Sequence, residues 1–330
     1  MENKINIGIT GTGSLIGQAV IKSILRSNVN EKLNLIGFDY FDKTVGSFWC
    51  SSNFILPDIL KNEVTEKDLV NYILEIIIIH DIKLLFIGVD FELPIFAKYK
   101  EQIEQKSSCK VMVSSSSVIE IANDKYLTYQ FLKDNHLNYP QSCLPQEYNS
   151  SEFKFPLIVK PRKGARSVGV NLVKDSDELQ KAVETVKEPV IQEHLGSMES
   201  EYTCGTIFLD NELKHIIPLK RYLKQGNTYI SYFEKSFPDL IYNYLKDVCA
   251  ILKPFGACNF QLRIDENGLP KIFEINSRHS GTTYIRSLFG YNEVEYIINY
   301  ILFNKEIKFN LKEGTVVRYY DEFFIPKSNS

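Results

Sequence analysis

The run Ala-Cys-Asn-Phe-Gln-Leu-Arg-Ile, residues 257–264, is followed by Asp-Glu-Asn-Gly and then by Leu-Pro-Lys-Ile-Phe-Glu-Ile-Asn-Ser-Arg, residues 269–278. Both runs alternate polar and apolar residues, which is typical of half-buried strands. Asn-Gly is the favoured centre of a two-residue hairpin turn. We therefore predict two antiparallel strands joined at Asn267 and Gly268.

This turn fixes which residues face one another across the hairpin. Directly opposed side chains share a face, and successive residues alternate between the two faces. The predicted opposite pairs are Gln261 with Glu274, Asn259 with Asn276, Phe260 with Ile275 and Leu262 with Phe273. One face is therefore apolar, and the other gathers one carboxylate and three amides.

The polar face of the hairpin has the composition of a magnesium site. Opposed side chains start about 4.5–5.5 Å apart at Cβ, so oxygens from both strands can reach one cation. Gln261, Glu274 and Asn276 offer oxygen ligands only, which suits Mg²⁺ (or Mn²⁺) that also binds phosphate. Arg278 adds a guanidinium suited to phosphate or acyl-phosphate oxygens. A solvated strand face is the alternative that the hairpin alone leaves open.

Composition narrows the class of protein. A chain of 330 residues suggests two or three packed domains, and a formal charge of −3 gives no general attraction to nucleic acid. Six scattered cysteines without a CxxC pair argue against zinc and disulfides. No signal-peptide pattern or bilayer-spanning apolar run is visible. We expect a cytoplasmic protein with neither a nucleic-acid nor a membrane partner.

The first part of the chain predicts a Rossmann-like domain over residues 1–117, because strands alternate with helices. Ser114 to Ser117 are expected to form the linker that follows. Gly11, Gly13 and Gly17 follow the first strand and Asp39 ends the next, as in dinucleotide sites. The spacing is GxGxxxG rather than GxGxxG, so this signal is weak. A tight turn without a dinucleotide is favoured, and an NAD-dependent oxidoreductase is the alternative.

The rest of the chain predicts a mixed α+β architecture. Residues 118–195 are expected to form a small lid and residues 196–330 a larger antiparallel sheet. The lid pattern runs strand, glycine loop, strand, helix and strand, with Ser176 as the N-cap of the helix. The larger domain is expected to contain one helix, residues 240–252.

Two segments of the lid carry groups that suit a nucleotide. Lys160 ends a strand and precedes a basic loop with glycines, which can grip phosphates through ammonium and backbone N–H groups. The loop lacks the GK[ST] of a Walker A motif, and a structural Lys-Pro pair is the alternative. Further on, Glu193 and Leu195 offer backbone groups to a purine, and Glu201 offers a carboxylate to a ribose. Ordinary salt-bridging glutamates are the alternative for this segment.

Taken in order, these pieces resemble an ATP-grasp enzyme, and most of all one ATP-grasp half of the carbamoyl phosphate synthase large subunit. The likeness spans Ile5 to about Phe303. It rests on Asp124-Lys125, Pro156-Leu157-Ile158-Val159-Lys160-Pro161, Gln192-Glu193-His194-Leu195-Gly196, Glu201-Tyr202-Thr203, Asn259-Phe260-Gln261 and Phe273-Glu274-Ile275-Asn276-Ser277-Arg278. Ser277 departs from the proline usual in the family, and the loop is poorer in glycine.

The resemblance implies a role for each matching residue. Lys125 and Lys160 would contact the phosphates of ATP, and the loop containing Gly164, Arg166, Ser167 and Gly169 would close over them. Glu193 and Leu195 would lie at the adenine and Glu201 at the ribose, and Gln192 would belong to the same nucleotide site. Gln261, Glu274 and Asn276 would bind one or two Mg²⁺ ions, and Arg278 would stabilise an acyl phosphate.

The implied activity is that of an ADP-forming ligase. A small-molecule carboxylate would be activated as an acyl phosphate and joined to an amine (or a thiol). Lys220 and Arg221 are candidates to orient the acceptor, and surface bases on a strand edge are an equal alternative. A single grasp unit argues against a complete carbamoyl phosphate synthase. The other hypotheses are the NAD-dependent oxidoreductase and a non-catalytic nucleotide-binding subunit. A homodimer is compatible with the sequence.

Overall fold

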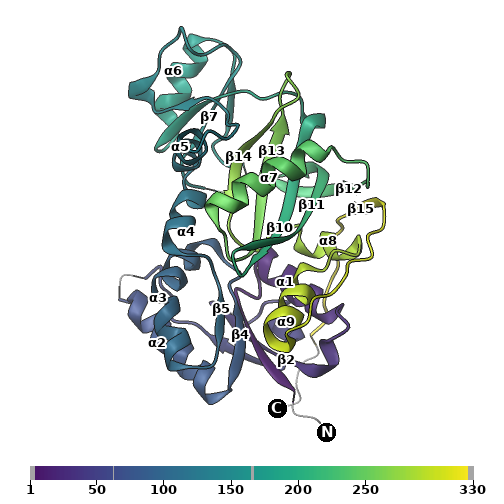
Figure 1. Cartoon of the computed structure of the whole chain (residues 1–330). Helices are drawn as coiled ribbons and strands as arrows, with labels where there is room; N and C mark the ends of the chain where they lie inside the picture. The colour runs from purple at the N-terminus through teal and green to yellow at the C-terminus, as the bar shows by residue number, and fades with distance from the viewer. Residues whose placement is uncertain (1–3, 62, 165–166, 326–330) are drawn as a thin grey trace.

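The computed structural model describes residues 4–61, 63–164 and 167–325. Within them the chain forms three sheets stacked along one long axis (Figure 1). The N-terminal sheet is parallel, with strand order β3-β2-β1-β4-β5. Its strands are β1 (Ile5–Thr10), β2 (Leu33–Asp39), β3 (Ser52–Ile55), β4 (Ile82–Phe86) and β5 (Lys110–Met112).

Helices cover both faces of the parallel sheet, as predicted for this domain. They are α1 (Leu15–Leu25), α2 (Glu66–Ile79), α3 (Leu93–Lys106) and α4 (Ser116–Asn123). Helices α2 and α3 enclose a separate core that includes Phe38, Ile73 and Leu85. On the other face, the core around Ile7 and Val20 continues without a break into the last domain. This shared apolar layer joins the first and last sheets.

A smaller antiparallel sheet forms the lid, with strand order β6-β9-β7-β8. Its elements are β6 (Ser142–Cys143), β7 (Leu157–Pro161), β8 (Asn171–Val173), β9 (Pro189–Glu193) and helix α6 (Ser176–Thr185), and α5 (Lys125–Asp134) leads into it. The lid has its own core, built on Leu157, Val159 and Leu179.

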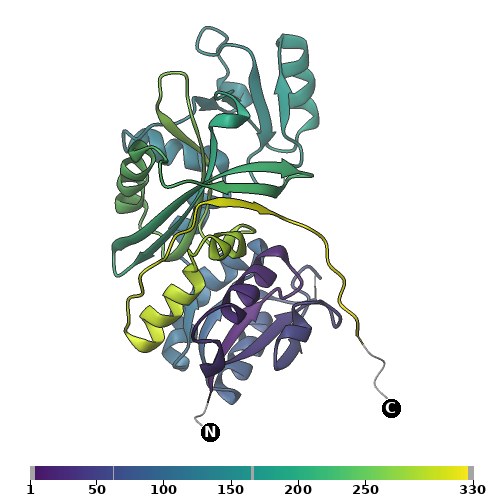
Figure 2. The ribbon, with the colours of Figure 1, turned by 90° about the vertical axis from the view of Figure 1, so that its right-hand side faces the viewer.

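The third sheet is six-stranded and antiparallel, with strand order β14-β13-β10-β11-β12-β15. The strands are β10 (Glu201–Leu209), β11 (Glu212–Lys224), β12 (Asn227–Phe233), β13 (Gly256–Ile264), β14 (Pro270–Asn276) and β15 (Gly314–Val317). Helix α7 (Asp239–Leu252) packs on one face, and α8 (Thr283–Leu288) and α9 (Glu293–Phe303) pack against α1. Figure 2 shows the segment after α9 crossing the molecule, adding β15 beside β12 and continuing past the N-terminal domain.

The fold class is confirmed, and three local predictions were wrong. Ser114 to Ser117 do not form a linker, because the hydroxyl of Ser115 accepts from the Val118 amide and caps α4. Asp175, rather than Ser176, caps α6. The last domain holds α8 and α9 in addition to the one expected helix.

Candidate functional site

A cavity of about 220 Å³ lies between the lid and the six-stranded sheet. Most of the residues predicted to bind a nucleotide line this first cavity. They are Lys125, Lys160, Gly164, Ser167, Gln192, Glu193, Leu195, Glu201, Gln261 and Glu274, together with Arg221, Arg263 and Phe273. Gly169 packs against Pro161 beside the cavity, and Arg166 lies outside the described residues.

Lys160 is buried at the back of the first cavity. Its ammonium donates to Gln192 Oε1 at 2.8 Å and to the Phe273 carbonyl at 3.3 Å. Burial, reinforced by the Lys125 cation, lowers the pKa of Lys160 to about 7, and the Glu274 carboxylate acts in the opposite direction. An ammonium held among few counter-charges gains free energy when an anion approaches.

A β-bulge in β14 supplies the carbonyl that Lys160 binds. Gln261 pairs with Glu274 as predicted, but Leu262 pairs with Ile272, so the predicted Leu262–Phe273 pair was wrong. Phe273 is therefore the one extra residue of β14, with no residue of β13 opposite it, and such bulges re-aim side chains. Phe273 turns into the first cavity.

The turn explains why the predicted register nevertheless held at the polar face. The Gly268 amide donates to the Asp265 carbonyl, and the Asp265 amide donates to the Leu269 carbonyl. The loop between Asp265 and Leu269 therefore holds three residues, one more than the predicted two-residue turn, and Gly268 in this loop has φ of +78°. The extra residue in the loop and the bulge at Phe273 offset each other.

Lys125 lies at the mouth of the first cavity, at the start of α5. Its ammonium donates to the carbonyls of Gly164 and Arg162 at 3.0 and 3.5 Å. Asp124 caps α5 and pairs with the Arg162 guanidinium at 2.6 Å. These contacts tie the glycine loop to the helix that begins the lid.

The end of β9 and Leu195 after it were predicted to lie at the adenine, and polar groups of these residues already have partners. The Glu193 carboxylate pairs with Lys271 at 2.6 Å. The Leu195 carbonyl accepts from Arg263 at 2.8 Å. Gln192 has its side chain between Lys160 and the Ser142 hydroxyl. The adenine contacts of this segment stay predictions.

Two arginines form ion pairs with the Glu201 carboxylate. Arg221 donates to one oxygen from Nε and a terminal nitrogen at 3.1 and 3.0 Å, and Arg263 donates to the other at 3.1 and 2.9 Å. Arg221 also donates to Gln261 Oε1 at 2.6 Å. A ribose at Glu201 or a cation at Gln261 would compete with these hydrogen bonds, so both roles stay predictions.

The opposed polar side chains lie where the hairpin register puts them. Gln261 and Asn276 each donate to Glu274 Oε1, at 3.3 and 3.0 Å. Among the described residues nothing donates to Glu274 Oε2 or to Asn276 Oδ1. These are hard oxygen donors, so the residues fit Mg²⁺. Asn259, opposite Asn276, is buried and accepts from Thr203 and Arg286 instead.

A second cavity, of about 170 Å³, opens from the same polar face toward the N-terminal domain. It shares Arg221, Gln261 and Glu274 with the first cavity. Its other walls come from the start of α1, the loop after β4, the β11–β12 turn and the segment after β15. Those lining residues include Ser14, Leu15, Asp90, Thr228, Asn276, Arg278, Ser280, Gly281 and Arg318.

The predicted catalytic side chains take different positions. Arg278 lines the second cavity, where its guanidinium pairs with Asp90 at 2.5 Å. Arg221 lines both cavities. Lys220 lines neither, because neighbouring residues of a strand point to opposite faces; its ammonium lies 5.7 Å from the centre of the Tyr202 ring. The role of each in catalysis stays a prediction.

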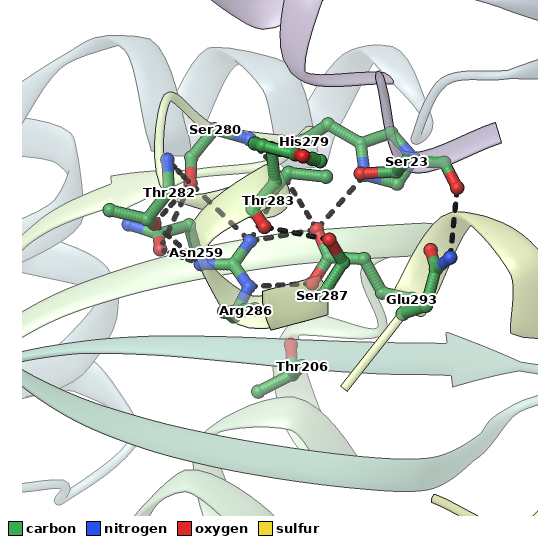
Figure 3. Close-up of polar contacts among 12 residues, drawn as sticks. Ser23, Thr206, Asn259, His279, Ser280, Thr282, Thr283, Arg286, Ser287 and Glu293 are labelled. Carbon is green, nitrogen blue, oxygen red and sulfur yellow. Dashed lines mark hydrogen bonds and ion pairs between the residues drawn. The ribbon is translucent and has the colours of Figure 1, made fainter. Parts of the chain in front are cut away.

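A buried polar network supports the wall of the second cavity (Figure 3). Arg286 binds Glu293 through two hydrogen bonds of 2.7 Å, and neither side chain is more than 1% exposed. The Thr283 hydroxyl and His279 also reach Glu293. Arg286 further donates to Asn259, Ser280 and Thr282. The segment that follows the predicted metal face is thereby anchored.

The glycine turn of the N-terminal domain uses its own hydrogen-bonding groups internally. Asp39 accepts from the Gly13 amide at 2.6 Å and from the Thr12 hydroxyl at 3.0 Å. A Cβ on Gly17 would lie 2.1 Å from the Gly11 carbonyl, so glycine there permits close strand–helix packing. The Asp39 carboxylate is thus committed to the turn, which argues against a ribose at this position.

Comparison with known proteins agrees with this geometry. A family model described as an ATP-grasp domain matches residues 122–282. Residues 122–282 therefore form an ATP-grasp domain. The match spans the lid, the glycine loop and the polar face of the hairpin. No helix in the described part of this ATP-grasp chain is long and apolar enough to cross a membrane.

Solved structures show the same fold at low identity. An L-amino acid ligase from Bacillus licheniformis aligns with a TM-score of 0.71 and 16% identity, covering 92% of this chain and 75% of that one. N5-carboxyaminoimidazole synthetase from Staphylococcus aureus, complexed with ADP, aligns with a TM-score of 0.69 and 15% identity, covering 96% and 81%.

Sequence relatives match over shorter stretches. D-alanine–D-alanine ligase from Petrotoga mobilis is 27% identical over 124 residues, which is 36% of this chain and 41% of that protein. Among the first curated relatives, the match spans from 33% to 55% of the relative's own length. The narrower likeness to carbamoyl phosphate synthase stays a prediction.

Proposed function

We propose that this ATP-grasp protein is an ADP-forming ligase that joins a small carboxylate to an amine (or a thiol). The observation that carries the proposal is the junction of the two cavities. The first contains the buried ammonium of Lys160, and both contain Glu274. A phosphate donor and an acceptor would therefore meet at one carboxylate face.

The proposed reaction has two steps. A carboxylate oxygen of the substrate attacks the γ-phosphorus of ATP, the bond to the β,γ-bridging oxygen breaks, and ADP leaves. The amine then attacks the acyl carbon, expels phosphate and loses a proton. Such transfers require positioning and charge neutralisation more than a covalent protein group. Bound Mg²⁺ would neutralise phosphate charge, with Glu274 and Asn276 as its protein ligands.

The cations of the site would act on different phosphates. Lys160 and Lys125 would bind ATP from the back and the mouth of the first cavity. Arg278 would leave Asp90 and bind the transferred phosphoryl group, since a guanidinium matches two oxyanion oxygens at once.

The test is ADP and phosphate release from Mg-ATP with a panel of carboxylates, each paired with amines and thiols. Glu274→Ala should lose at least a hundredfold in turnover, as expected when a group that stabilises transferring charge is removed. Glu266→Ala, an exposed glutamate in the same hairpin, is the matched control and should retain activity. Undiminished magnesium-dependent turnover in Glu274→Ala would falsify the proposal. Nucleotide binding without turnover by any pair would favour the non-catalytic subunit.

A further inference from the structure

Three arginines line the second cavity, and their electrostatic environments differ. Arg278 pairs with Asp90, and Arg221 pairs with Glu201. Arg318 forms no ion pair with a carboxylate among the described residues, and its guanidinium donates to the Gly281 carbonyl. A partly buried cation that has only a neutral partner is poorly compensated for the water it has lost.

The surroundings of Arg318 increase this deficit of negative charge. Burial lowers the pKa of Arg318. The pKa of Lys22, on α1, is lowered by burial and by the nearby Arg318 cation, and Asp321 offsets part of this. Leu15 and Ile16, in the first turn of α1, also line the cavity, and this end of a helix carries partial positive charge.

The backbone holds Arg318 in place. Val317 pairs with Ile230 at the edge of the six-stranded sheet, and the Arg318 amide donates to the Tyr229 carbonyl at 2.8 Å. The guanidinium also contacts the Gly281 carbonyl, in the segment anchored by Arg286. The pairing of β15 with β12 and the contact with the Gly281 carbonyl together hold Arg318 at the wall of the second cavity.

We propose that the second cavity binds a small amino acid as the acceptor and that Arg318 holds its carboxylate. This inference rests on the proposed ligase function and names the acceptor class. At a share of about 30 Å³ per water molecule, a volume of about 170 Å³ has room for roughly six water molecules, or as many non-hydrogen atoms of a ligand. With its carboxylate at Arg318, the amine of the ligand remains free to face Glu274 and Asn276, where the acyl phosphate would form.

The experiment measures binding rather than turnover. The full chain with Mg-ADP is titrated with each of the twenty L-amino acids and with the corresponding amino acid amides, by calorimetry. At least one free amino acid should bind, and its amide should bind about tenfold to a hundredfold more weakly, as expected for a lost hydrogen bond between charged groups. Arg318→Gln should weaken binding of the free amino acid by the same factor and leave binding of its amide unchanged.

Two further variants separate recognition from folding. Arg318→Lys keeps the charge without the fork of donors and should recover part of the affinity. Lys308→Gln removes an exposed cation from the same segment, outside the cavity, and should change nothing. Affinity for ADP should be the same in all variants, because Arg318 does not line the first cavity.

The proposal is overturned if no free amino acid binds, if acid and amide bind equally, or if Arg318→Gln binds the acid as tightly as the unaltered chain. Because the readout needs no chemistry, it remains informative if Glu274→Ala disproves the ligase. Retained discrimination between acid and amide would then identify an amino-acid-binding protein that carries out a different reaction.

Discussion

The buried pair of Arg286 and Glu293 offers the sharpest test of how the cavity wall is built. Glu293→Gln keeps the shape of the side chain but removes its charge, and the new amide presents a donor where Arg286 also donates. Neither side chain is more than 1% exposed, so water cannot replace the lost partner. Breaking a buried pair from one side costs about 3–5 kcal/mol. We expect Glu293→Gln to lower the free energy of unfolding by this amount.

Urea unfolding followed by circular dichroism measures this loss, provided that the slope with urea is unchanged. Lys98→Gln is the matched control, since Lys98 and Glu66 form an ion pair of 2.6 Å on the exposed surface. Its midpoint should not move. A loss below about 1 kcal/mol in Glu293→Gln would refute the reasoning.

The pH dependence of this loss has a definite sign. Burial alone would raise the pKa of Glu293, but the Arg286 guanidinium and the hydrogen bonds hold it well below 4.5. A carboxylate with a lowered folded pKa contributes stability above its ordinary pKa and loses it as the pH falls further. The difference between Glu293→Gln and the unaltered chain should therefore be constant from pH 7 to 5 and shrink below about 4.5.

Three further predictions concern the first cavity and the glycine turn. Because the pKa of Lys160 is about 7, affinity for ADP should fall as the pH rises above 7, and Lys160→Met should lack this component in calorimetry from pH 6 to 9. Phe273→Ala should weaken ADP binding about threefold to tenfold, the contribution typical of an aromatic contact, with Mg²⁺ dependence unchanged. Asp39→Asn should cost about 1–3 kcal/mol in urea unfolding without altering ADP affinity. Measurable NADH binding that Asp39→Asn abolishes would revive the oxidoreductase.

The parts of the site that could be predicted from sequence depend on short-range patterns. Alternation and the Asn-Gly turn placed Gln261 opposite Glu274, although the turn type was wrong. The order of the lid strand, the glycine loop and the segment around Glu193 predicted that Lys160 and Glu201 share a nucleotide site, and both residues line the first cavity. These features need only neighbours along the chain, or one hairpin, to be recognised.

The missed parts depend on long-range pairing. Arg286 and Glu293 lie on two different helices, α8 and α9. Helix α8 has only six residues, so its apolar pattern is too short to be recognised from the sequence. Arg318 reaches its cavity because β15 pairs with β12, far back along the chain. The two arginines at Glu201 come from β11 and β13, and only the register of both with β10 brings them together.

The bulge at Phe273 has a consequence for how this hairpin can change during evolution. Glu274 and Asn276 face the cavities because they pair with Gln261 and Asn259, and opposed side chains share a face. With the present loop, straightening the bulge while keeping Phe273 would pair Phe260 with Glu274 and turn both oxygen ligands to the opposite face of the sheet. A two-residue loop would give the observed pairs at Gln261 and Asn259 without a bulge. The length of the loop is thus coupled to a strand irregularity several residues away.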